Sequence, residues 1–262
     1  MPAIYTHYAV AYALFQKLPS RIQEKISPFL PLYYFGSQGA DFCFFYRVLG
    51  EKQPNLGSYL HRAGGYEAFQ LLKKFSKHSH ALFAYAVGYL THYAADATFH
   101  PYVYAMTGKS YTKHSRLEGA LDWYFKPRLQ NLPREILFQK PSRDEETELY
   151  ILFSAIAKKA GFSPLIKSHF SRAIFLFNAY PPISSAIFSN EKNAYIEYAI
   201  NHEKRQWHYP ADPNLLRNDD ADTLFDKAVI FAQTLVKEFC DNIQNNAPLP
   251  LLLFGKNHLT GL

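Results

Sequence analysis

The sequence predicts an all-α fold, a multi-helix bundle, on three observations. Apolar residues recur at the spacing of amphipathic helices, loop signals separate these segments, and no strand-like alternation of any length is present. Prolines and glycines between the segments, such as Pro19 and Pro127, indicate where helices end. The expected helical segments are residues 3–18, 21–30, 59–77, 81–99, 112–125, 148–160, 164–179, 183–201 and 221–243.

The composition is that of a packed globular chain. Of its 262 residues, 48% are hydrophobic and 19% are charged, which excludes a disordered protein and allows one large domain or two small ones. Aromatic residues make up 17%, enough to line a core and also to wall a pocket for an apolar ligand. The formal charge of +6 suits a phosphate-bearing substrate, but without a dense Lys/Arg run it does not predict nucleic-acid binding.

Cysteine use and the first residues bear on the compartment. Cys43 and Cys240 form neither a disulfide framework nor a CxxC pair, so we expect buried thiols. The opening stretch MPAIYTHYAVAYALF has no basic region and no small-residue cleavage site, so we expect no signal peptide. No apolar run reaches the roughly 18 residues of a transmembrane helix. We therefore expect a cytoplasmic protein.

Six potential metal ligands lie between His92 and Asp122, in two ladders. One ladder comprises His92, Asp96 and His100 and the other His114, Glu118 and Asp122, each with a spacing of four residues. Four residues of an α-helix turn through about 400°, so the three groups of a ladder share one face. Pro101 and Gly108 indicate a short loop between two antiparallel helices. The six groups could therefore converge, and burying them without a cation would cost several kcal/mol.

Three further residues extend this set: His7, Asp41 and His61. Simpler explanations exist, because His7 could be a core histidine with one hydrogen bond and Asp41 a helix N-cap. With His92, Asp96, His100, His114 and Glu118 they make five imidazoles and three carboxylates, the ligands of zinc and also of iron or manganese. Eight such ligands fit two or three ions held between the helices of a bundle. The alternative is a buried, hydrogen-bonded polar cluster without an ion.

Several motifs resemble one protein family. The segments THYA, GSQGADFCFFY, YLHR, GYLTHYAADATFHPYV and KHSRLEGALDWY are similar to those of the bacterial zinc-dependent phospholipase C family, which shares its fold with the S1/P1 nucleases. The resemblance covers residues 1–126 closely and continues more weakly through the helical second half, where NHEKRQWHYP resembles a Trp-and-Pro loop of the family. The fold implied by the resemblance is an all-α bundle of the phospholipase C and P1 nuclease type.

The resemblance also implies three metal sites. One zinc would be held by Asp41, His61, His92 and Asp96, with Asp96 bridging to a second ion near His7, and a further zinc by His100, His114 and Glu118. Asp41 would be the base or the orienter of the attacking water, and Asp122 would accept the N–H of a ligating histidine. In the secreted phospholipases an N-terminal tryptophan supplies its amine and carbonyl to one ion, whereas this chain begins MPA.

The function that the resemblance implies is that of a metal-dependent phosphodiesterase. A metal-bound hydroxide would cleave a phospholipid or a small phosphodiester, in a pocket walled by Phe45, Tyr46 and Trp207. A nuclease of the S1/P1 type and a non-catalytic helical module stabilised by its ions are the alternatives. Because the sequence offers no clear basic groove, no stable nucleic-acid partner is expected, and the absence of cysteine ligands disfavours a purely structural zinc site.

The expected domain organisation follows from the same residues. We expect residues 1–262 to form one all-α hydrolase domain, with the metal ligands within 1–126 and the helices of 148–243 completing the bundle. The oligomeric state is not readable from the sequence.

Overall fold

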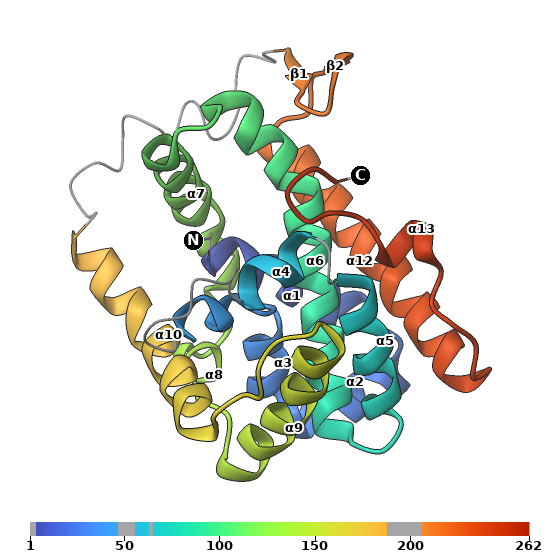
Figure 1. Ribbon diagram of the computed structural model, residues 1–262. Helices are drawn as coiled ribbons and strands as arrows, with labels where there is room; N and C mark the ends of the chain where they lie inside the picture. Colours follow the sequence, from blue (N-terminus) through green and yellow to red (C-terminus); the bar gives the residue numbers. More distant parts are fainter. Residues whose placement is uncertain (1–3, 47–55, 63–64, 188–205, 262) are drawn as a thin grey trace.

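The structure is a computed structural model that describes residues 4–46, 56–62, 65–187 and 206–261 (Figure 1). Most of these residues lie in helices, which confirms the predicted all-α class, and one small β-hairpin is an addition that was not predicted. The elements are α1 (Ile4–Lys17), α2 (Ser20–Ile26), η1 (Ser27–Phe29), α3 (Leu30–Gly36), η2 (Asp41–Phe45), α4 (Leu56–Arg62), α5 (Gly65–Ser76), α6 (His80–Thr107), α7 (Tyr111–Phe125), η3 (Lys126–Leu129), α8 (Arg134–Leu137), α9 (Arg143–Lys159), α10 (Lys167–Ile187), β1 (Trp207–Tyr209), β2 (Asp212–Arg217), α12 (Ala221–Gln244) and α13 (Leu251–Phe254), where η marks a 3-10 helix.

Helix α6 is the centre of the fold. It runs through the middle of the bundle in Figure 1, and α1, α3, α5, α7 and α12 all pack against it. Its sequence is apolar nearly all round, and every side chain from Ala81 to Ala97 is buried. A Cβ on Gly88 would lie 2.1 Å from the Tyr33 carbonyl oxygen on α3, so the backbones of these two helices are in direct contact.

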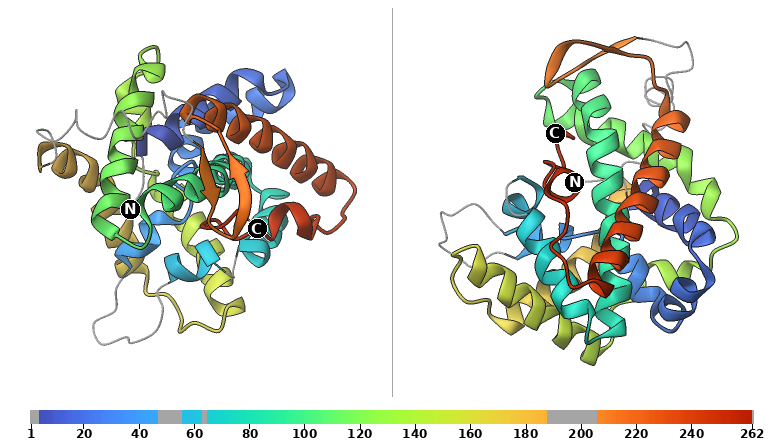
Figure 2. Two further views of the ribbon diagram at one scale, coloured as in Figure 1. Left: turned by 90° about the horizontal axis from the view of Figure 1, so that it is seen from above. Right: turned by 90° about the vertical axis from the view of Figure 1, so that its right-hand side faces the viewer.

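The last described segment of the chain returns to α6. In the right-hand view of Figure 2, α12 runs along one side of α6, and the segment that follows α13 returns along the other side. We call residues 247–261, which include α13, the C-terminal strap. One connected apolar core spans the described part of the chain from Ile4 to Phe254. None of the described helices is both long enough and apolar enough to cross a membrane.

Helix α6 differs from the prediction at its C-terminal end, because it continues through Pro101 to Thr107. A proline inside a helix removes one hydrogen bond and costs ~3 kcal/mol or more. Tyr102 and Val103 are fully buried just beyond it, and their burial offsets this cost. The turn comes instead at Gly108, whose φ of +57° suits glycine. Helix α7 then begins behind its N-cap residue, Ser110, as the predicted antiparallel partner.

The region between α10 and α12 also differs from the prediction. Strands β1 and β2 pair in an antiparallel hairpin where the sequence predicts no strand and resembles a Trp-and-Pro loop. Strands of three and six residues are too short for an alternating pattern to be evident. Of the expected helix at 183–201, residues 183–187 belong to α10, and 188–205 lie outside the described residues.

Candidate metal centre

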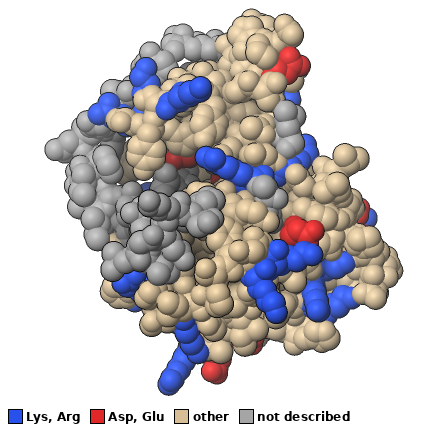
Figure 3. All heavy atoms as spheres, in the orientation of Figure 1, with Lys and Arg blue, Asp and Glu red and all other residues tan. Residues whose placement is uncertain are grey.

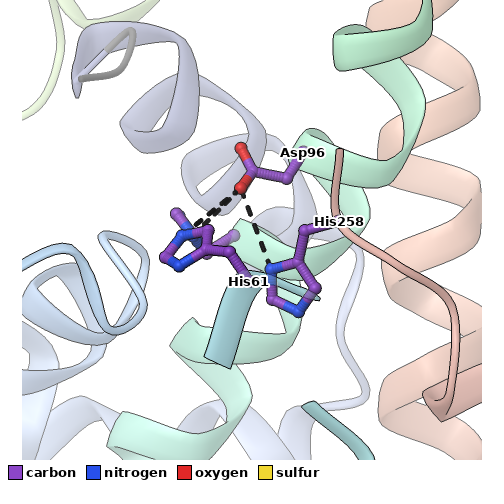
Figure 4. A group of neighbouring side chains, drawn as sticks. His61, Asp96 and His258 are labelled. Carbon is purple, nitrogen blue, oxygen red and sulfur yellow. Dashed lines mark hydrogen bonds and ion pairs between the residues drawn. The ribbon is translucent and has the colours of Figure 1, made fainter. Parts of the chain in front are cut away.

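Asp96, on the buried face of α6, is at the centre of the site. Its Oδ2 faces ring nitrogens of His92 at 3.3 Å, His61 at 3.7 Å and His258 at 3.8 Å. His92 precedes Asp96 by one helical turn, whereas His61 comes from the end of α4 and His258 from the C-terminal strap (Figure 4). One donor atom from each of the four residues lies within 4.8 Å of the others. We call His61, His92, Asp96 and His258 the Asp96 cluster.

The hydrogen bonds of His61 indicate positive charge on the ring or next to it. Its Nδ1 lies 2.8 Å from the Gly57 carbonyl, which can only accept, so Nδ1 carries a proton. In the neutral ring Nε2 then presents a lone pair, yet it faces Asp41 Oδ1 at 3.0 Å and His92 Nε2 at 3.2 Å. Carboxylate oxygens also only accept, so lone pairs confront one another unless the ring is protonated or a cation lies between them.

Gly39 makes the space that His92 occupies. Its φ is +57°, and a Cβ at this position would lie 2.2 Å from Cδ2 of the His92 ring. The left-handed backbone of Gly39 also redirects the chain into η2, which begins with Asp41. One glycine therefore brings both an imidazole and a carboxylate to the site.

A second cluster forms where α6 faces α7. Glu118 Oε1 lies 2.8 Å from His114 Nε2 and 3.4 Å from His100 Nε2. His114 and Glu118 are one helical turn apart on α7, and the hairpin at Gly108 places them opposite His100. His100 Nδ1 lies 3.2 Å from the Asp96 carbonyl and so carries a proton, which leaves Nε2 to face the Glu118 carboxylate either as a protonated donor or as a ligand of a cation between them. The three donor atoms lie within 4.8 Å of one another. We call His100, His114 and Glu118 the Glu118 cluster.

A small space is lined by residues of both clusters. Its volume is about 20 Å³, and His7, Asp96, His100 and Glu118 are among the residues that line it. This is room for about one water molecule or one ion. Asp96 Oδ1 faces it, 3.4 Å from His7 Nε2 and 3.5 Å from His100 Nδ1. Asp96 therefore directs one carboxylate oxygen to each side, as a bridging ligand would.

Burial and neighbouring charges shift the pKa values of the site in opposite directions. Burial lowers the pKa of His92 to about 3 and that of His258 to about 4, so both rings are neutral at pH 7. Burial raises the pKa of the Asp41, Asp96 and Glu118 carboxyls, but the surrounding imidazoles outweigh it and hold all three below their usual range. These carboxylates in turn outweigh burial and raise the pKa of His7, of His61 and of His100, the last to about 9. Positive charge, on these imidazoles or on a bound cation, therefore balances the three buried carboxylates.

The donor set fits divalent cations. Within the described residues, buried site atoms without a hydrogen-bond partner include Asp41 Oδ2, Glu118 Oε2, His7 Nδ1, His92 Nδ1 and both ring nitrogens of His258. An unsatisfied buried polar atom costs ~1–3 kcal/mol, so this many would be a large penalty in a protein without ions. Imidazole nitrogens and carboxylate oxygens are ligands that zinc prefers, and each cluster could hold an ion.

Both clusters open into one cavity of about 840 Å³. Its buried floor is formed by Asp41, His61, Asp96, His100 and Glu118. Its exposed rim carries three basic side chains, Arg62, Lys109 and Arg172, and its walls include Phe44, Phe45 and Leu176. In Figure 3 acidic atoms are visible inside a recess of this face, with basic side chains nearby. The cavity therefore combines a floor of potential ligands with a cationic rim.

The eight ligands predicted from the sequence all lie at this site. The second predicted set, His100, His114 and Glu118, is the Glu118 cluster. The first predicted set is present but altered, because His258 joins His61, His92 and Asp96 in the group of mutually close donors. Asp41 lies beside that group, with Oδ1 3.0 Å from His61 Nε2 and 3.9 Å from His92 Nε2.

Of the three predicted pocket residues, the structure places only Phe45 at the cavity wall. The Tyr46 hydroxyl instead accepts the N–H of Ile166 at 2.7 Å. Trp207 is buried in β1 against Tyr102, with 5.6 Å between ring centroids, and donates to the Asp219 carbonyl. The hairpin that was not predicted is the reason, because its first strand packs against α6 and Trp207 does not line the cavity.

Asp122 differs from its predicted role. Its Oδ1 accepts the backbone N–H of Thr6 at 2.7 Å and the Thr6 hydroxyl at 3.0 Å, rather than a histidine N–H. These donors lie in the first turn of α1, so Asp122 on α7 caps a different helix. Burial raises the pKa of the Asp122 carboxyl to about 7. Its contribution to the site is indirect, because it fixes the helix turn that carries His7.

His258 is the site residue that the sequence analysis missed. It lies in the apolar C-terminal strap, without another ligand at helical spacing, so no local pattern singled it out. Only tertiary packing brings it to Asp96. The one available signal is a lone imidazole within the apolar run LPLLLFGKNHL.

The helical fold and this donor set define a metalloprotein of the helix-bundle class, with a site open to a substrate. The family model for zinc dependent phospholipase C matches residues 6–175, which is more than half of the chain and includes the predicted ligands. The chain therefore belongs to the zinc-dependent phospholipase C family and is a hydrolase of that family. Neither a curated protein nor a solved structure matches it.

Proposed function

We propose that this protein cleaves a phospholipid, or a small phosphodiester with similar chemistry, at ions held by the Asp96 and Glu118 clusters. The observation that carries the proposal is the cavity floor, where three buried carboxylates and the imidazoles meet an open volume of about 840 Å³. A purely structural metal site is closed by its own ligands, whereas a catalytic site keeps a position for water and substrate. Phospholipid as the substrate class is what the family implies.

The bound ions and Asp41 would have different roles in hydrolysis of the phosphodiester. When bound, zinc would stabilise negative charge on the phosphate oxygens and lower the pKa of a water molecule. Asp41 Oδ1 lies 3.0 Å from His61 Nε2, so the carboxylate is held in a fixed orientation at the cavity floor. Its Oδ2 is buried and has no hydrogen-bond partner in the described part of the chain, and we propose that this carboxylate accepts a proton from the attacking water. Attack at phosphorus breaks the bond to the leaving alcohol and gives an alcohol and a phosphomonoester.

We propose zinc as the ion, one in each cluster, with a third in the small space beside His7. Iron or manganese would suit the same donors. We further propose that residues 1–262 act as a single domain, since the C-terminal strap and α1 both contribute to one site.

Asp41→Asn tests the proposed reaction most directly. We expect phosphodiester hydrolysis to fall about 100- to 10,000-fold, since asparagine cannot accept the proton. The measurement is release of diacylglycerol from phospholipid vesicles by the zinc-loaded protein, with single-stranded DNA as a second substrate. Asp241→Asn, at a partly exposed carboxylate on α12 that is paired with Lys237, is the matched control and should leave the rate unchanged. An unchanged rate in Asp41→Asn would reject the role of Asp41, and preferential cleavage of DNA would favour a nuclease.

The rim suggests a preference among head groups. Arg62, Lys109 and Arg172 line the cavity at its exposed edge, above a floor that ions would make positive. We propose that anionic head groups are accepted better than zwitterionic choline, because like charge at the rim would repel the ammonium.

Lys109→Gln tests this preference. One exposed charge is worth about 1 kcal/mol, so we expect kcat/KM for an anionic phospholipid to fall about fivefold, with little change for phosphatidylcholine. The measurement compares vesicles of both compositions at low and high salt, because salt screens exposed charges. Lys113→Gln, on the same helix hairpin but outside the cavity, is the control. Equal effects on both lipids would mean that the rim does not select the head group.

A further inference from the structure

The C-terminal strap is held against the site by specific hydrogen bonds. The Tyr66 hydroxyl donates to the Leu249 carbonyl at 2.9 Å, and the Tyr93 hydroxyl donates to the Leu253 carbonyl at 2.8 Å. Tyr93 also accepts the backbone N–H of Lys256 at 2.9 Å. These tyrosines belong to α5 and α6, so the strap is fixed to the helix that carries His92 and Asp96 and to a helix packed against it.

The end of the strap is pressed onto the ligand-bearing elements. The backbone N–H of His258 donates to the carbonyl of His61, itself a candidate ligand, at 3.2 Å. Gly261 has a φ of +70°, and a Cβ there would lie 2.5 Å from the Ala97 carbonyl oxygen on α6. The backbone bond at His258 and the close approach at Gly261 fix this short segment at two points. The position of the His258 imidazole is therefore fixed as well.

The imidazole of His258 is buried without any of the partners that a buried histidine normally has. The residue is 1% exposed, and both ring nitrogens are without a hydrogen-bond partner among the described residues. The ring packs against Tyr93 at 4.7 Å between centroids and against Phe69 at 6.5 Å. Its Nδ1 is directed at Asp96 Oδ2, 3.8 Å away. A gap of this size between a nitrogen and a carboxylate oxygen is too long for a hydrogen bond, and it suits two ligands of one cation.

We propose that His258 is a metal ligand that completes a four-donor set with His61, His92 and Asp96. The ion would then fasten the C-terminal strap to α4 and α6, so metal binding and strap docking would be one event. His258 lies outside residues 6–175, the segment that matches the family model, so the family match does not supply it. Asp41, adjacent to the set, keeps its unpartnered oxygen for water. The inference concerns metal binding and does not depend on the proposed substrate.

Zinc affinity tests this ligand directly. The metal-free protein is titrated with zinc against a chromophoric chelator, for the native chain and for His258→Gln and His258→Ala. We expect one zinc equivalent to bind at least about 10-fold more weakly in both variants. With Co²⁺ in place of zinc, the visible absorption of that ion should change in His258→Gln. His208→Gln in the exposed hairpin and Phe254→Leu in the strap are controls that keep the four donors.

Hydrogen exchange of the strap gives a second readout, which needs no variant. We expect the amides of residues 249–261 in the native chain to exchange more slowly when zinc is added. His258→Gln should lose this zinc-dependent protection and Phe254→Leu should keep it. Native zinc affinity and cobalt absorption in a folded His258→Gln would overturn the proposal, as would strap exchange in the native chain that does not respond to zinc. None of these measurements uses catalysis, so inactivity towards phosphodiesters would leave their outcome unaffected.

Discussion

The Asp96 and Glu118 clusters are assembled in different ways. The Glu118 cluster is local, because one helix hairpin supplies all three residues and the span from His100 to Glu118 is short. The Asp96 cluster draws on α4, α6 and the C-terminal strap, and its residues run from His61 to His258. All of the Asp96 cluster is buried, whereas His114 of the Glu118 cluster is partly exposed.

The difference teaches that one metal site can form from local structure while another needs the complete tertiary structure. Local i, i+4 ligands are in place as soon as the hairpin forms, at little entropic cost. Ligands distant in sequence are brought together only when the tertiary structure is complete, so such a site reports on the whole fold. We therefore expect substitutions in the Asp96 cluster to lower both stability and metal content. Substitutions in the Glu118 cluster should affect only the ion bound there.

Asp96→Asn should have the largest effect on metal content. Its two oxygens face His61, His92 and His258 on one side and His7 and His100 on the other, so loss of one charge weakens ions on both sides. We expect at least a 1,000-fold loss of activity, on the order of the loss of strong electrostatic stabilisation. Elemental analysis of untagged protein, purified without added metal or chelator, should find two or three zinc equivalents in the native chain and at least one fewer in Asp96→Asn.

Glu118→Gln is the matched comparison for Asp96→Asn. It should lose no more than one equivalent, because among the described residues Glu118 Oε1 is paired with His100 and His114 of its own cluster. If both variants lost the same zinc, the two clusters would not be separate sites. If the native chain held one equivalent or less, several of these residues would be ordinary packed polar groups.

Gly39→Ala should disrupt the Asp96 cluster and spare the other. The added Cβ would lie 2.2 Å from the His92 ring, and φ of +57° strains any residue with a side chain. We expect the free energy of unfolding to fall by about 1–3 kcal/mol, together with loss of one zinc equivalent. Chemical denaturation and metal analysis measure these two quantities. Gly119→Ala, where a Cβ would meet open space, is the control on α7 and should be neutral or slightly stabilising.

Asp122→Ala should have the smallest effect. It removes the acceptor for the first-turn donors of α1, and loss of such a cap costs about 1 kcal/mol. The melting temperature should fall by about 2–4 °C, while zinc content stays at the native value. A lost equivalent would instead mean that the position of α1, and with it His7, is needed to retain the ion between the clusters.

Sequence periodicity was sufficient for the ligand ladders because helix geometry fixes which side chains share a face. The sequence of α6, which is apolar nearly all round, explains its central position, since such a helix must be buried. The sequence prediction was wrong about the end of α6, because local propensity at Pro101 is overruled by the burial of Tyr102 and Val103. The lesson is that tertiary packing decides where a buried helix ends.

His258 and Trp207 illustrate what spacing cannot predict. Each reaches its place through an element with little local pattern, the C-terminal strap for His258 and a short hairpin for Trp207. The sequence pattern favoured Trp207 as a pocket wall because of its resemblance to a family loop, and it gave His258 no weight. Their roles depend on contacts with residues more than one hundred positions earlier, Tyr102 for Trp207 and His61 for His258.

The imidazole of His100 has a consequence for the order in which ions bind. Its Nε2 faces Glu118 and its Nδ1 faces Asp96, so one ring touches both clusters. A cation on Nε2 would make the Nδ1 proton more acidic, strengthen its bond to the Asp96 backbone carbonyl, and place positive charge near Asp96 Oδ1, which lies 3.5 Å from Nδ1. Thermodynamic linkage then makes the influence mutual: the factor by which the first ion changes the affinity for the second equals the factor in reverse. Binding of metal ions to the Asp96 and Glu118 clusters should therefore be cooperative rather than independent.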